Sequence, residues 1–453
     1  MPPILTEEKT TSAPAAPGEL RRVLTHWDAV ALIAGIMIGS GIFATPPQIA
    51  ATMDRFGPMI MVWLLGGLLA LCGALTYAEL AAMYPRTGGV FVFLREAWGK
   101  PPAFIYGWSA LLITYPASIA AVSVVFAAYF KRLFPGIPLP ENIIAALLAV
   151  AACAVNMTGV VLGARVQRTF TAAKVAALVA LVGFALIANA GRFENLTPVW
   201  STPSQGWSLG ALALAMAAVL WTYEGGSDGP TLSGECRDKQ RDLPRALMIG
   251  TGMVTLVYIL VNTSYVYVMS IPGIAASNSV AVDMAEKTMG QYGGLFVNLL
   301  VLASTAGSVN GMVIAGSRVS FAMAREGLFF NVVGQVHPKL KTPANAVIVL
   351  GIVSATYCLL GTFDQLIRYF VFISMIWYIM SILAVYRLRI TRPAAERPFR
   401  VPLYPITPTI FVIAALGLLY QLYHENTRDS LIGLAILAVS LPTYWIWRRF
   451  HQR

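Results

Sequence analysis

The chain has 453 residues, of which 57% are hydrophobic and only 12% are charged. A typical soluble domain carries roughly 25% charged residues, so these charges are too few to cover the surface of a water-soluble protein of this length. The composition excludes an ordinary soluble domain and indicates an integral membrane protein.

Residues 1–26 are polar and rich in Pro, Ala and Thr, which predicts a disordered tail. The apolar run that follows is long and lacks a small-residue cleavage pattern, so we expect no cleavable signal peptide.

From residue 27 onward, apolar runs long enough for the roughly 20 residues of a membrane-spanning helix follow one another. They are continuously apolar, whereas the strands of a membrane β-barrel alternate. We therefore expect an all-α integral membrane protein with one domain over residues 27–453 and no soluble module. Its twelve predicted spans are 27–50, 58–83, 103–130, 143–162, 170–189, 209–232, 247–271, 295–322, 344–360, 365–387, 408–423 and 430–448.

The net charge of +11 has an uneven distribution along the chain. If the N-terminus is cytoplasmic, the inside loops hold most of the cations, whereas the outside loops hold few, such as Arg55, Lys131 and Arg192. Positive charge concentrated in one set of loops marks the cytoplasmic side. We expect both termini in the cytoplasm of a multi-pass protein of the cell membrane. The charge then reflects topology, and no nucleic-acid partner is expected.

The sequence offers no pattern of a catalytic or metal site. The four cysteines (Cys72, Cys153, Cys236 and Cys358) have no paired spacing, and the four histidines lie at span ends or in loops. We expect no cofactor, no metal and no catalytic residue. A membrane enzyme, a channel and a transporter-like sensor are the alternatives from other classes, and none has a supporting motif.

Two of the predicted spans are interrupted. Span one contains "GIMIGSGIFATPP", in which Gly39, Ser40 and Gly41 form a polar-centred triplet near the middle of the span. Span six contains "TYEGGSDGP", with Glu224, Gly225 and Asp228 in one short stretch. Non-helical backbone and charged side chains are tolerated in a bilayer only within protein or beside a watery cavity, where they mark functional sites.

The two interruptions are five spans apart, an odd number, so the second unit enters the membrane with reversed orientation. Matching interruptions in two inverted halves indicate the substrate site of a secondary transporter. Free N–H groups at a half-helix start attract a carboxylate, and unwound carbonyls accept from an ammonium group. A zwitterion such as an α-amino acid fits both, which predicts an amino-acid carrier.

Six segments, in this order, resemble the L-type amino-acid transporter group of the amino acid–polyamine–organocation superfamily. They are "IGSGIF" (38–43), "YAEL" (77–80), "TGGVFVFLREAWG" (87–99), "FTAAKVAAL" (170–178), "GSVNGMVIAGSRVSFAMAREG" (307–327) and "HPKLKTP" (337–343). The resemblance implies a LeuT-type fold that works by alternating access. Its two inverted five-helix repeats would cover residues 27–189 and 209–387, with helices 1 and 6 broken and two extra helices within 408–448.

The resemblance also implies where substrate binds. The amides of Ser40 and Gly41, with that of Gly39, would hold the substrate carboxylate. Carbonyls of Met37, Trp221 and Glu224 would hold the amine beside Gly225, and the Trp221 ring would close over the substrate. An interfacial tryptophan is the alternative for Trp221.

Lys174 lies in "FTAAK", where the resemblance places a lysine in the position of the sodium ion of sodium-coupled relatives. Ser308 and Tyr265 match residues that surround this lysine. The prediction is a sodium-independent carrier of neutral amino acids, by exchange or proton coupling. The alternative for Lys174 is a side chain that extends to the cytoplasmic surface.

The sequence departs from the family pattern at three points. Gly226 and Ser227 stand where relatives commonly have tryptophan and asparagine, which predicts a wider pocket. Glu224 and Asp228 leave three roles open: selection of a cationic amino acid or polyamine, proton coupling, or capping of the following half-helix by Asp228. The loop 131–142 lacks the cysteine that joins relatives to a heavy chain, so no covalent partner subunit is expected.

Overall fold

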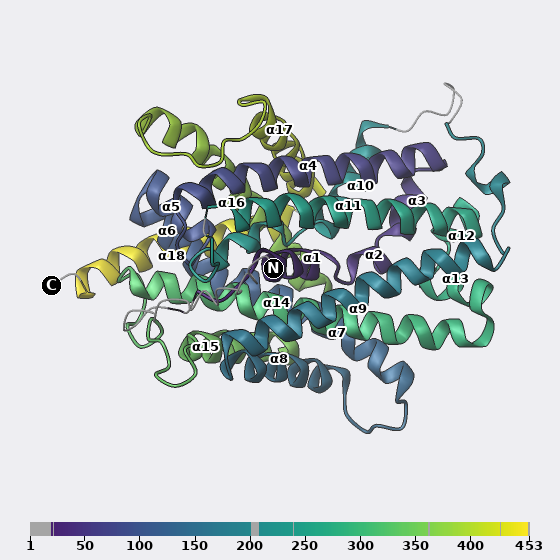
Figure 1. Ribbon diagram of the computed structural model, residues 1–453, viewed down its shortest axis with the longest axis horizontal. Helices are drawn as coiled ribbons and strands as arrows, with labels where there is room; N and C mark the ends of the chain where they lie inside the picture. Colours follow the sequence, from purple (N-terminus) through teal and green to yellow (C-terminus); the bar gives the residue numbers. More distant parts are fainter. Residues whose placement is uncertain are drawn as a thin grey trace, which may run out of the picture.

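The computed structural model describes residues 20, 22–200, 208–238, 240–360, 363–425 and 427–451. Most of the predicted N-terminal tail, residues 1–19 and 21, lies outside the described residues. Within them every regular element is a helix, and an isolated bridge joins Leu24 to Cys236. Figure 1 shows most of the helices running along the long axis of the molecule as one bundle, with α1 in its interior. The expected all-α fold is confirmed.

Each of the twelve predicted spans has a helical counterpart among the described residues. In chain order the helices of these spans are α1 (His26–Met37) with α2 (Gly41–Ala44), α4 (Phe56–Met83), α6 (Lys100–Ser109) with the π-helix η1 (Ala110–Thr114) and α7 (Tyr115–Leu133), α8 (Glu141–Met157), α9 (Val160–Ile187), α10 (Leu209–Thr222) with the 3-10 helix η4 (Gly226–Leu232), α11 (Asp242–Val268), α14 (Gly293–Arg325), α15 (Ala344–Leu360), α16 (Phe363–Thr391), α17 (Ile406–Glu425) and α18 (Thr427–His451).

Short helices connect these spans. They are α3 (Pro46–Thr52), α5 (Val90–Trp98), η2 (Phe193–Leu196), α12 (Ile271–Ala275), α13 (Val280–Met289) and η5 (Gly290–Tyr292). Within the described residues, nine helical stretches are long and apolar enough to cross a membrane, and α8, α10 and α15 are shorter. The chain is thus a multi-pass membrane protein.

The predicted boundary between spans four and five is wrong. The turn lies at Thr158 and Gly159, and α9 already begins at Val160 rather than near residue 170. The polar residues Arg165, Gln167 and Arg168 suggested a loop, but they occupy the first turns of a 28-residue helix. A helix of that length extends beyond the hydrocarbon layer, so its first turns can carry charge.

Both predicted interruptions are present. The first helix stops at Met37 and resumes at Gly41, and the second stops at Thr222 and resumes as a 3-10 helix at Gly226. The capping box of Thr25 and Asp28 starts α1, and every residue from Asp28 to Met37 is buried. The irregular backbone that follows is therefore screened from lipid by α9, α11 and α14, which pack around α1.

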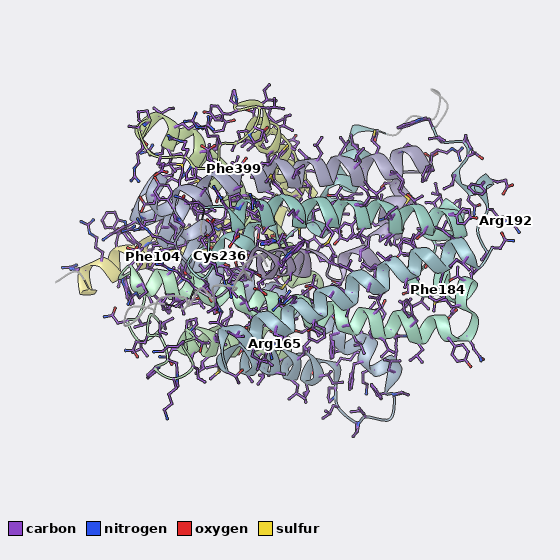
Figure 2. The ribbon with its side chains drawn as sticks, viewed as in Figure 1. Phe104, Arg165, Phe184, Arg192, Cys236 and Phe399 are labelled. Atoms are coloured by element: carbon purple, nitrogen blue, oxygen red, sulfur yellow. The ribbon has the colours of Figure 1, made fainter. Side chains whose placement is uncertain are left out.

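Ion pairs join the helices at the end of the bundle where α18 terminates. Arg318 of α14 binds Glu235 through two hydrogen bonds of 2.8 and 3.2 Å, and both side chains are buried. Figure 2 shows Phe104 and Cys236 toward this end and Phe184 and Arg192 toward the opposite end. Because a buried pair that loses one partner is strongly destabilised, this pair holds α14 against the segment after η4.

Candidate functional site at the two helix breaks

The two breaks lie directly against each other, because glycines remove the side chains that would separate them. A Cβ on Gly225 would meet Ile36 Cγ2 at 2.6 Å and the Met37 nitrogen at 3.1 Å. One on Gly41 would meet the Thr222 side chain at 2.8 Å. Gly225 also has φ of +116°, a conformation that other residues adopt only at a cost. The glycine signals in the sequence thus reflect close approach between the two breaks.

The first break presents unpaired backbone donors. The Gly39 amide turns back to the Met37 carbonyl at 2.8 Å. The next amides, those of Ser40, Gly41 and Ile42, have no backbone acceptor among the described residues. Free amides at the start of a helical segment favour an anionic group. This geometry is what a substrate carboxylate requires.

Two of the three carbonyls expected to hold the substrate amine, those of Met37 and Trp221, are engaged in this structure. The Met37 carbonyl accepts from the Tyr258 hydroxyl at 2.6 Å and from the Gly39 amide. The Trp221 carbonyl accepts from the Glu224 amide at 3.2 Å. An ammonium group would have to share or displace these donors.

Lys174 of α9 lies beneath the first break and is completely buried. Its Nζ donates to the carbonyls of Gly35 and Ile38, both at 2.7 Å, and of Ser304 at 2.9 Å. The Ser308 hydroxyl lies at 3.3 Å. The side chain therefore points into the protein instead of extending to the surface, and its ammonium group is surrounded by oxygen atoms from two helices.

Two hydroxyl groups of α14 link Lys174 to the break. Ser308 Oγ donates to the Gly35 carbonyl at 2.9 Å, and Ser304 Oγ donates to the Ile38 carbonyl at 2.9 Å. Tyr265, expected beside Lys174, is not placed among these partners. Its buried hydroxyl has no hydrogen-bond partner in the described part of the chain. The tyrosine of α11 that reaches the breaks is Tyr258, which bonds the carbonyls of Met37 and Thr222.

The second break carries the carboxylates. Glu224 Oε1 accepts a short hydrogen bond from the Tyr378 hydroxyl, and its Oε2 is buried with no partner among the described residues. Asp228 Oδ1 accepts from the Tyr115 hydroxyl at 2.5 Å. The capping role considered for Asp228 is wrong, because η4 begins after Gly225 and has no side-chain cap. Asp228 instead lies inside the 3-10 turn, with its carboxylate turned toward α7.

A cavity with about 680 Å³ of empty space joins the two breaks. Gly39, Ser40, Gly41, Trp221 and Glu224 all line it, together with residues of α7, α14 and α16. The structure thus brings the predicted substrate residues to one cavity, except Gly225, which lines the adjoining one.

A second, more apolar cavity of about 610 Å³ adjoins the first, between α4, α10, α16 and α17. Glu224, Ser227 and Tyr378 line both cavities, and Gly226 lines only the apolar one. A Cβ on Gly226 would meet nothing within 4 Å. The missing side chain at this position therefore leaves space, as expected from the sequence.

Sequence reasoning missed Tyr115, Tyr258, Ser304 and Tyr378. Each lies in the middle of an apolar span, where a single hydroxyl is usually a packing residue with one polar contact. The role of each hydroxyl depends on its hydrogen-bond partner, and that partner lies on another helix distant in the sequence. No local pattern could have distinguished them.

Comparison with known proteins places the chain in a family. A family model described as "Amino acid permease" matches residues 24–441. The b(0,+)-type amino acid transporter 1 of Mus musculus is 35% identical over 98% of this chain and 90% of its own length. Asc-type amino acid transporter 1 of Rattus norvegicus is 33% identical, over 95% of this chain and 82% of its own.

The large neutral amino acids transporter small subunit 2 of Mus musculus is also 33% identical, over 94% of this chain and 81% of its own. These similarities extend over nearly the whole chain and confirm the resemblance found in its motifs. Together with the all-helical fold and the paired breaks, they show that the chain belongs to the amino acid permease family.

Proposed function

We propose that this chain is a sodium-independent carrier that moves neutral amino acids across the cell membrane by alternating access. Family membership supports amino-acid transport, and the names of the relatives include neutral amino acids. The cavity at two facing helix breaks supports a carrier mechanism, because such breaks expose backbone groups to a ligand at mid-membrane depth.

The position of Lys174 is the main support for sodium independence. Its ammonium group has oxygen partners at 2.7, 2.7 and 2.9 Å from the carbonyls of Gly35, Ile38 and Ser304. Carbonyl and hydroxyl oxygens converging on one point are also what a sodium ion requires. A tethered cation in this place fixes the unwound segment permanently and leaves no room for an exchangeable ion.

The substrate carboxylate binds at the amides of Ser40 and Gly41, and Glu224 and Asp228 face the rest of the substrate from the opposite break. The Glu224 side chain lines the cavity, and its Oε2, which has no partner among the described residues, is an acceptor for the α-ammonium group, since the Met37 carbonyl is already engaged. A zwitterionic substrate then bridges the two breaks.

The orientation follows from charge. Arg325 ends α14, and the Trp447 indole near the end of α18 donates to the Gly327 carbonyl, so these two helices end together. We assign this end, near which Arg318 also lies, to the cytoplasm. Residues 27–189 and 209–387 form the two inverted repeats. The chain works without a covalently attached partner subunit and is not an enzyme.

Reconstitution of the purified full-length protein in liposomes tests the proposal. Labelled alanine, leucine, arginine and putrescine are offered outside, with and without unlabelled amino acid inside, at two proton gradients and without sodium. We expect saturable uptake of a neutral amino acid. Stimulation by internal substrate identifies exchange, and uptake into empty vesicles driven by protons identifies symport. Uptake of putrescine alone, or of none of the four, contradicts the proposal.

A further inference from the structure

A third large cavity, distant from the helix breaks, lies where α8 ends and α9 begins. It contains about 700 Å³ of empty space, and three cationic side chains line it: Arg165 of α9, and Lys339 and Lys341 of the loop before α15. Figure 2 labels Arg165, which lies in the same half of the molecule as α8 and α15 in Figure 1. Nothing in transport at the two breaks requires this cluster.

Hydrogen bonds hold the lysine-bearing loop against the α8–α9 turn. The Thr342 hydroxyl donates to the Met157 carbonyl, the last of α8, at 3.1 Å. Within the loop, the His337 amide donates to the Thr342 carbonyl at 2.9 Å, and the Leu340 amide donates to His337 Nδ1 at 3.2 Å. Lys339 and Lys341 are therefore presented to the cavity by a structured loop.

Among the described residues, the three cations have no balancing acid. In the described part of the chain, no carboxylate lies within ion-pair distance of Arg165, Lys339 or Lys341. Arg168, one turn farther along α9, differs from them because it pairs with Asp28 at 3.3 Å. Three like charges around one cavity repel each other, so an anion between them is favoured.

Backbone donors add to the positive charge. Gly159 precedes α9 without a side-chain cap, and the amides of Val160, Val161 and Leu162 have no acceptor among the described residues. These groups line the same cavity as the cations. They are suited to the oxygens of a phosphate group.

The rim of the cavity is apolar and faces outward. Val161, Leu162 and Leu340 have exposed fractions of 54%, 41% and 38%. A soluble anion would make no use of such a rim, whereas the acyl chains of a lipid would cover it. Basic pockets between membrane helices on the cytoplasmic side bind anionic lipid headgroups.

We propose that this cavity binds the phosphate headgroup of an anionic phospholipid of the cytoplasmic leaflet. Arg165, Lys339 and Lys341 contact the phosphate, and the lipid chains lie over Val161 and Leu162. The lipid joins the α8–α9 turn to the loop before α15, which belong to different repeats of the proposed architecture.

The test uses the full-length protein in detergent, titrated with dioctanoyl phosphatidylglycerol and followed by native mass spectrometry. The variant R165Q/K339Q/K341Q removes the three charges of the cavity. The variant R241Q/R245Q/R400Q removes the same charge from exposed positions outside it and serves as the matched control. Dioctanoyl phosphatidylcholine and inorganic phosphate are titrated in parallel.

We expect saturable binding of phosphatidylglycerol that weakens at least tenfold in the cavity variant and less than twofold in the control variant. Equal weakening in both variants would show attraction to net charge and would overturn the site. Phosphatidylcholine binding as tightly as phosphatidylglycerol, or phosphate binding as tightly as the lipid, would overturn the anionic-lipid assignment. Binding is measured without transport, so the result does not depend on the proposed function.

Discussion

The two helix breaks face the same cavity but use different chemistry. At the first break the groups are backbone: free amides at Ser40 and Gly41, and carbonyls at Gly35 and Ile38 fixed by Lys174. At the second they are side chains, the carboxylates of Glu224 and Asp228 held by tyrosines of other helices. The backbone groups can recognise the carboxylate and ammonium groups that all amino acids share. The side chains of the second break can select among substrates that differ in their own side chains. The first break should therefore govern whether transport occurs, and the second which substrate is transported.

The largest expected effect comes from Lys174→Ala at the first break. The substitution leaves three carbonyls and a hydroxyl without their common donor in a buried site, at a cost of about 1–3 kcal/mol for each group that stays unpaired. We expect uptake in liposomes to fall to background while much of the protein still folds, as judged by gel filtration. Lys131→Ala is the control, because among the described residues Lys131 Nζ bonds only the Ile137 carbonyl, which lies in a loop, and uptake should persist. Unchanged uptake by Lys174→Ala would remove the lysine from the mechanism.

The contact between the breaks is tested by two neighbouring glycines. Gly225→Ala places a methyl group 2.6 Å from Ile36 and requires an unfavourable φ, which costs about 1–2 kcal/mol even without the clash. Gly226→Ala meets nothing within 4 Å and is the matched control. We expect Gly225→Ala to lower both the melting temperature and the transport rate, and Gly226→Ala to leave both near wild type. Equal behaviour of the two variants would contradict close packing of the breaks.

At the second break, Glu224→Gln should change selectivity more than rate. The substitution removes the charge of the free Oε2 yet keeps an acceptor for the Tyr378 hydroxyl. We expect a severalfold change in the ratio of leucine to arginine uptake or in the pH dependence of uptake. Tyr378→Phe, which frees Oε1 but preserves the charge, should alter the ratio less. If neither variant alters selectivity or pH dependence, Glu224 has a structural role.

The smallest effect is expected from filling the apolar cavity. Gly226→Leu adds a side chain where the structure has open space between α4, α16 and α17. Leucine uptake should then fall about twofold to tenfold relative to alanine uptake, a loss of up to about 1.4 kcal/mol for a larger side chain. Equal uptake ratios in the variant and the wild type would show that substrates do not enter this cavity.

The sequence predicted the first break better than the second. Its glycines and Lys174 lie in two short motifs, and backbone chemistry depends little on what surrounds it. The Asp228 carboxylate was harder to interpret, because its partner Tyr115 is 113 residues away and lies beside a π-helix that no pattern indicated. The same limit applies to Tyr258, because its partners, the carbonyls of Met37 and Thr222, lie on other helices.

The all-helical membrane fold could be predicted from apolar runs, and the boundary between spans four and five could not. Charged residues usually mark loops, but Arg165 and Arg168 lie on a helix that extends beyond the hydrocarbon layer. Hydropathy identifies the part of a helix that lipid surrounds, but it does not indicate how far the helix continues into the interface. The glycine at position 159, which adopts a positive φ in this turn, was the signal in the sequence for the true boundary.

Sodium dependence of uptake by the wild-type protein tests the central claim most directly. Initial uptake of the preferred amino acid is measured in liposomes with sodium, potassium or choline as the external cation at equal ionic strength and pH. Because the Lys174 ammonium group already occupies the oxygen-lined position beneath the first break, we predict equal rates in all three. Uptake that requires sodium, or rises severalfold with it, would contradict the account.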